Sequence, residues 1–103
     1  MRATVDPKDM ALALKHVKPV VPLFKRAAFV RVTLKAADQL IRLETSDDIF
    51  ATFACQVDEF GQCEIPWQAV SRVLATYKRQ ACVTIRSDKD GFWIEKLRFP
   101  HVI

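Results

Sequence analysis

The sequence predicts an α+β fold in which two helices pack on one face of an antiparallel sheet. Apolar residues recur at helical spacing in two stretches, near residues 7–18 and 67–77, and they alternate with polar residues in most of the remaining chain. The expected order is therefore strand, helix, four strands, helix and two strands. A length of 103 residues fits one domain, covering residues 1–103, with a single hydrophobic core.

Residues 1–5 are expected to form a short strand that leads into the first helix. Asp6 suits the N-cap position and Pro7 the first helical position, where a missing N–H costs nothing. Pro19 is expected to prevent the helix from continuing. Three apolar residues lie on one face of this helix at helical spacing: Met10, Leu14 and Val17.

Residues 28–57 change to a period of two, which predicts three successive antiparallel strands joined by short turns, and a further short strand is expected after a loop. The expected strands cover residues 28–35, 40–45, 49–57 and 63–66. A second helix is expected from Trp67, with one apolar face formed by Val70, Val73, Leu74 and Tyr77.

The last part of the chain is expected to form a hairpin. Residues 80–86 alternate again, Asp88–Gly91 has the composition of a tight turn, and residues 92–99 are expected to form the returning strand. Because each helix has one narrow apolar face, both are expected to bury that face against the same side of the sheet.

The composition excludes several classes of protein. Only two glycines occur, so a glycine-rich phosphate loop is absent. The N-terminus lacks the apolar segment of a signal peptide, and no apolar run approaches the ~18 residues of a membrane helix. The three cysteines are odd in number and scattered, which predicts free thiols and a cytoplasmic protein: Cys55, Cys63 and Cys82.

No pattern indicates catalysis or metal binding. The cysteines and the two histidines, His16 and His101, lack the close spacing of metal ligands. The adjacent acidic pairs fall at expected turns, where aspartate is common for backbone reasons. The sequence therefore predicts a protein that is not an enzyme and that holds no cofactor or metal.

Basic residues gather on the outward faces of both helices. Lys8, Lys15 and Lys18 lie opposite the apolar face of the first helix, and Arg72 and Arg79 opposite that of the second. Neither residues 10–37 nor residues 65–87 contain an acid. An ordinary solvated face of a basic protein has this appearance, and so does a surface that binds a phosphate backbone.

The whole pattern resembles one domain of the bacterial sliding clamp, the beta subunit of DNA polymerase III. The resemblance includes a strand that enters a helix through a proline, at Cys63–Leu74. The other matching stretches are Met1–Val17, Phe29–Thr45, Ile49–Val57 and residues 81–99.

The resemblance implies a non-enzymatic domain that associates with duplex DNA without reading its sequence. It further implies self-association through strand edges, and replication or repair proteins as further partners. The alternative is a protein-interaction module of the same fold that binds a clamp or another partner through a strand edge without contacting DNA. Eight basic residues are the expected DNA contacts: Lys8, Lys15, Lys18, Lys25, Arg26, Arg72, Lys78 and Arg79.

Two features depart from that family. Clamps contain several such domains in one chain, and their domain ends with one more strand than residues 92–103 are expected to supply. A domain of this length has a diameter of roughly 33 Å, so about six copies would be needed to surround a duplex. One copy cannot encircle DNA, and a closed ring requires assembly.

Overall fold

The computed structural model describes residues 1–18, 30–45 and 49–99. It contains two helices and nine strands in these ranges. In chain order the elements are β1 (Arg2–Val5), α1 (Pro7–His16), β2 (Arg31–Ala37), β3 (Leu40–Glu44), β4 (Phe50–Ala54), β5 (Gln56–Glu59), β6 (Gly61–Pro66), α2 (Trp67–Thr76), β7 (Val83–Asp88), β8 (Gly91–Ile94) and β9 (Leu97–Phe99).

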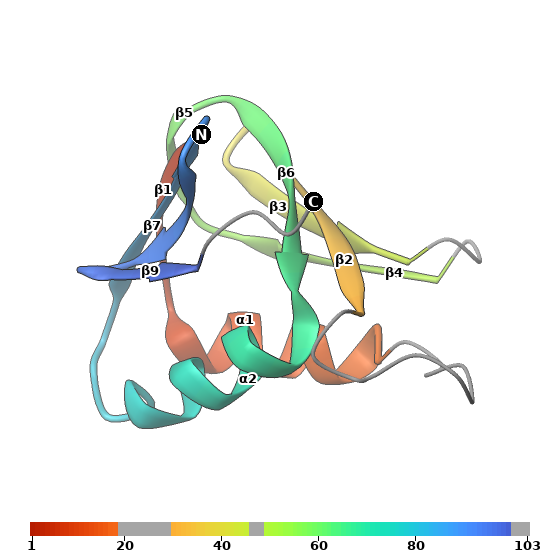
Figure 1. Cartoon of the computed structure of the whole chain (residues 1–103), viewed down its shortest axis with the longest axis vertical. Helices are drawn as coiled ribbons and strands as arrows, with labels where there is room; N and C mark the ends of the chain where they lie inside the picture. The colour runs from red at the N-terminus through yellow and green to blue at the C-terminus, as the bar shows by residue number, and fades with distance from the viewer. Residues whose placement is uncertain (19–29, 46–48, 100–103) are drawn as a thin grey trace.

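The two helices lie side by side in one layer, and the strands lie on one side of that layer (Figure 1). The strands form two antiparallel sheets, with the orders β5-β1-β7-β8-β9 and β4-β3-β2-β6. The α+β class, the antiparallel pairing and the placement of both helices on one side are confirmed. The strands divide between two sheets, however, where the sequence analysis expected one.

The division into two sheets arises inside the stretch expected to be a single strand, residues 49–57. The chain leaves β4 at Cys55 and enters β5, which pairs with β1 in the other sheet. Ala51 and Phe53 in β4 and Val57 in β5 all point inward. The alternation continues through the corner without a change of phase, so it gives no sign of the break.

A second break occurs in the stretch expected to be one strand over residues 92–99. Glu95 has a φ of 54°, a left-handed conformation that reverses the chain between β8 and β9. Here the alternation does shift, because Phe92 and Ile94 point inward before the turn and Phe99 after it. The extra β9 is the closing strand that residues 92–103 were not expected to supply.

The core lies between the helix layer and the sheets. Asp6 caps α1 as predicted, its side chain accepting a hydrogen bond of 2.8 Å from the Lys8 backbone N–H. The predicted apolar face of α1 is fully buried, at Met10, Leu14 and Val17. On α2, Val70 and Leu74 are fully buried, whereas Val73 and Tyr77 lie at the rim and are partly exposed.

The dimensions agree with the size expected for one compact domain. The radius of gyration is 12.6 Å and the principal extents are 37 × 26 × 26 Å. Among the described residues, neither helix is long and apolar enough to cross a membrane. A single copy remains too small to surround a duplex, as the chain length predicted.

Candidate nucleic-acid interface

The outward face of α1 carries exposed lysines. Lys8 and Lys15 are exposed, one near each end of the helix, and Leu12 lies exposed between them. Lys18 follows the helix, and its Nζ lies 5.9 Å from the centre of the Trp67 ring. All three lysines predicted on this face are therefore at the surface of the helix layer.

On α2, the structure agrees with the predicted stripe at one position and differs at its end. Arg72 is exposed on the face opposite Val70. The helix ends at Thr76, with Tyr77 as its C-cap, so Lys78 and Arg79 lie in the turn that follows. Both are exposed, and they lie at the end of the helix layer rather than along the helix itself.

A hydrogen bond fixes the two helices against each other. The indole Nε1–H of Trp67 donates to the backbone oxygen of Leu14 over 2.8 Å, joining residues 53 positions apart. The Ser71 hydroxyl donates to the backbone oxygen of Trp67 over 2.7 Å. Trp67 opens α2 and Leu14 lies in the last turn of α1, so this bond joins the start of one helix to the end of the other, and the two helices lie side by side in one layer (Figure 1).

The net positive charge comes from the helix layer, defined as residues 6–18 and 66–80. The sheet region, defined as residues 1–5, 30–45, 49–65 and 81–99, has eight basic and eight acidic residues. The helix layer has six basic residues and two acidic ones, Asp6 and Asp9. The six are Lys8, Lys15, Lys18, Arg72, Lys78 and Arg79.

The basic residues of the two regions also differ in pairing. Four in the sheet region form ion pairs, and none of the six in the helix layer does so with a described acid. Lys35 and Arg42 both bond Glu44 and hold the pKa of that carboxyl below its usual value. The four pairs are Arg2–Asp58 at 4.0 Å, Lys35–Glu44 at 2.6 Å, Arg42–Glu44 at 3.0 Å and Arg86–Asp88 at 3.3 Å.

Two of the eight predicted contact residues, Lys25 and Arg26, lie outside the described residues. The described ranges contain no group of three or more residues able to hold a metal ion. His16 is exposed near the end of α1, beside the lysines rather than within a catalytic group.

A groove of about 590 Å³ lies between α1 and β4. Leu12 and His16 line it from the helix, and Ala51 and Phe53 line it from the strand. Within the described ranges β4 ends its sheet and pairs with β3 alone, so no described strand covers its outer edge. No local sequence pattern marks this groove, because its lining comes from two elements that are far apart in the chain.

No protein-family model and no curated protein matches this sequence. Solved structures of similar fold include the Helicobacter pylori beta clamp bound to a DNA ligase peptide, with a TM-score of 0.79 and 18% identity. Others are the sliding clamp of Bartonella birtlesii bound to griselimycin (0.75, 18%) and pol III beta of Caulobacter crescentus (0.73, 21%). The matches cover 96–97% of this chain and 28–29% of theirs. The chain thus spans less than a third of their length.

Proposed function

We propose that this chain, which has the fold of one bacterial sliding-clamp domain, is a non-enzymatic module that associates with duplex DNA without sequence specificity. The observation that carries the proposal is the charge distribution. The helix layer holds six basic residues with no ion pair to a described acid, and the sheet region is neutral. A regular anionic polymer is the partner that suits such a surface.

The chemistry of the surface favours contacts to the backbone over contacts to bases. Lysine and arginine side chains on two neighbouring helices can reach phosphates, whereas the two aromatic side chains of the layer, Trp67 and Tyr77, are only partly exposed for stacking on bases. Trp67, the one tryptophan in the layer, donates its N–H to Leu14 and is only partly exposed. We therefore propose that Lys8, Lys15, Lys18, Arg72, Lys78 and Arg79 contact phosphates, together with Lys25 and Arg26.

A ring requires several copies, and we propose that they associate through strand edges. β4 ends one sheet and β9 ends the other, and exposed apolar side chains accompany both, Phe50 on β4 and Leu97 on β9. If the β4 edge of one copy pairs with the β9 edge of the next, each end of the assembly still has one free edge. Further copies can therefore add until a ring closes. A role of this kind belongs in replication or repair, in the cytoplasm, where such a ring would keep another protein on DNA.

The test of DNA binding is fluorescence anisotropy with two unrelated duplexes over a salt series. The double variant Arg72→Glu/Arg79→Glu should bind both duplexes more weakly and to the same degree, because backbone contacts carry no sequence information. Log affinity of the unmodified protein should fall with log salt by roughly 0.9 per contacted phosphate, and the variant should show a shallower slope.

The matched control is Lys89→Glu/Lys96→Glu, which changes the net charge equally but in exposed turns of the sheet region. It should bind nearly as well as the unmodified protein. Equal losses in both variants would mean that net charge alone drives the binding. The absence of binding at low salt would contradict the DNA proposal.

The second candidate is a protein-interaction module that binds a clamp or another partner through a strand edge. The groove between α1 and the open edge of β4 favours it, because a strand added there would place alternate side chains against Leu12 and Phe53. The same anisotropy series separates the two, since this module would leave duplex DNA unbound at any salt concentration.

A further inference from the structure

β5 ends the five-stranded sheet, and an edge strand of this kind is normally open to pairing with another chain. Among the residues that the structure describes, it pairs with β1 alone, with Val57 opposite Ala3. Gln56, Asp58 and Glu59 are exposed, so solvent reaches this strand. Its other side would therefore offer backbone groups to an incoming strand unless something occupies them.

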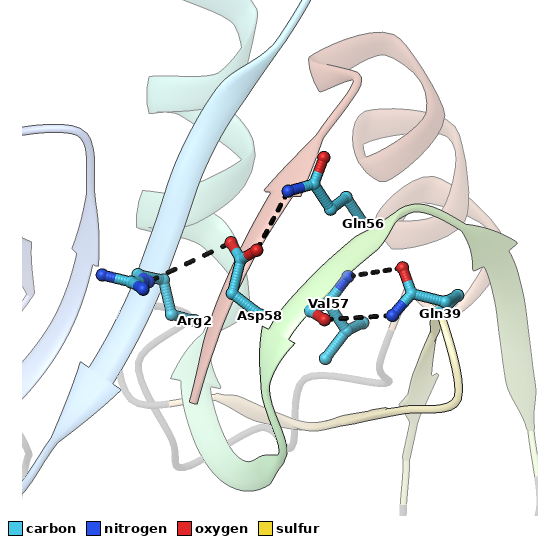
Figure 2. A network of polar contacts seen from close by, with 5 residues as sticks. All are labelled: Arg2, Gln39, Gln56, Val57 and Asp58. Carbon is cyan, nitrogen blue, oxygen red and sulfur yellow. Dashed lines mark hydrogen bonds and ion pairs between the residues drawn. The ribbon is translucent and has the colours of Figure 1, made fainter.

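The side chain of Gln39 occupies them. Its Oε1 accepts a hydrogen bond of 3.1 Å from the Val57 N–H, and its Nε2 donates one of 3.0 Å to the Val57 backbone oxygen (Figure 2). Two such bonds to one residue reproduce the pattern that a residue of a neighbouring antiparallel strand would make. The amide, with one donor and one acceptor side by side, can make both at once.

The backbone of Gln39 holds this side chain in place. Gln39 has a φ of 60°, in the tight turn between β2 and β3, and glutamine seldom adopts this conformation. Its backbone oxygen accepts a hydrogen bond of 3.1 Å from the Cys55 N–H. One residue thus binds the chain at the corner between β4 and β5, at Cys55, and just after it, at Val57.

We propose that Gln39 closes the β5 edge against the addition of another strand, so that association is confined to the remaining edges. Gln39 is itself exposed, and its removal would therefore uncover the backbone of Val57. The inference refines the strand-edge association proposed above, and it is independent of DNA binding. It identifies Gln39 as a residue that determines which edge a second copy can use.

The test is Gln39→Leu, which keeps a side chain of similar size but removes the amide. The Val57 N–H should exchange with deuterium faster in the dilute variant, and adding protein should slow that exchange again as copies pair along β5. In sedimentation velocity, the variant should associate at concentrations about tenfold below those that the unmodified protein needs.

The chain offers a matched control in Glu95→Leu. Glu95 also has a positive φ, and its carboxylate accepts a hydrogen bond of 2.9 Å from the Thr84 N–H. Thr84 belongs to β7, an inner strand that pairs with β1 at Thr84 and with β8 from Ile85 onward. The Thr84 oxygen still accepts from the backbone N–H at position 95 in the control, so only one N–H of an inner strand loses its partner. The control should unfold more easily than the unmodified protein but should associate no more readily.

A second variant, Gln39→Glu, covers the case in which Gln39→Leu does not fold. At neutral pH the carboxylate can accept from the Val57 N–H but has no proton for the Val57 oxygen, and protonation at acid pH restores the donor. It should therefore associate more readily than the unmodified protein at pH 7 and equally at pH 4.

Association of Gln39→Leu equal to that of Glu95→Leu would overturn the proposal, and so would an unchanged Val57 exchange rate. Association of Gln39→Glu that does not change between pH 7 and pH 4 would also overturn it. An unmodified protein that stays monomeric would instead count against the ring, while the comparison between the variants would still decide the role of Gln39.

Discussion

The helix layer and the sheet region differ in the balance and in the pairing of their charged side chains. The sheet region has equal numbers of acids and bases, and four of its bases form ion pairs across or along strands. The helix layer has three times as many bases as acids, and Asp6, one of its two acids, is engaged in capping α1. Half of the bases in the sheet region are thus paired with acids, whereas none in the helix layer is paired with a described acid.

Stability does not explain the difference. An exposed ion pair contributes only about 0–1 kcal/mol, so either arrangement is compatible with a stable fold. Unpaired charges of one sign nevertheless create a field that extends several ångströms into solvent. The helix layer therefore has the property expected of a binding surface, and the sheet region has that of a solvated exterior.

The largest expected effect on stability distinguishes the buried faces of the two helices from their exposed faces. Leu74→Ala removes a fully buried side chain of α2 and should lower the free energy of unfolding by about 2–5 kcal/mol. Leu12→Ala removes a side chain of α1 that is 70% exposed, and its effect should stay within about 0.5 kcal/mol. Urea unfolding measures both. Similar losses would show that the outer face of α1 is packed rather than free.

A smaller effect is expected at the contact between the helices. Trp67→Phe removes the hydrogen bond to the Leu14 oxygen while it keeps an aromatic ring, and should cost about 1 kcal/mol in urea unfolding. Because this bond sets the two helices against each other, duplex binding should weaken as well. A loss of stability without any loss of binding would indicate that the two helices contact DNA separately.

The smallest effect concerns the ion pairs of the sheet region. Lys35 and Arg42 lower the pKa of Glu44, so their pairing stabilises the fold above the pKa of the unfolded carboxyl and is lost as pH falls through the folded pKa. Glu44→Gln should therefore be slightly less stable than the unmodified protein at pH 7, and the difference should shrink as the pH is lowered through the folded pKa of Glu44. Thermal unfolding over a series of pH values checks this, and a difference that does not change with pH would mean that Glu44 acts through packing.

Local sequence patterns predicted an element well wherever the residues at its boundary themselves favour a helix start or a turn. Asp6 and Pro7 marked the start of α1, and Gly91 marked the turn between β7 and β8. Two corners were not predictable in this way, because the residues that form them lack turn character. At Cys55 the inward residues keep their phase, and at Glu95 a non-glycine residue adopts a positive φ.

The candidate surface was predictable in part, because helical spacing places Lys8, Lys15 and Arg72 on exposed faces, whereas Lys78 and Arg79 follow the end of α2. Six of the eight predicted residues lie exposed in one layer, and their contact with DNA stays a prediction. The two hydrogen bonds between the Gln39 side chain and the Val57 backbone were not predictable, because they join residues 18 positions apart through a side chain in a turn. Only the folding of two sheets against each other brings these groups together.

The most direct test of the account is to follow the backbone amide signals of the protein by NMR while a short duplex is added at low salt. The account predicts that signals from the helix layer, near Lys15, Arg72 and Arg79, shift with added duplex and return as salt is raised. Signals from β3 and β8 in the sheet region should stay in place. Shifts centred on β4 or elsewhere in the sheet region, with the signals of the helix layer unchanged, would contradict the assignment of the helix layer as the surface that contacts DNA.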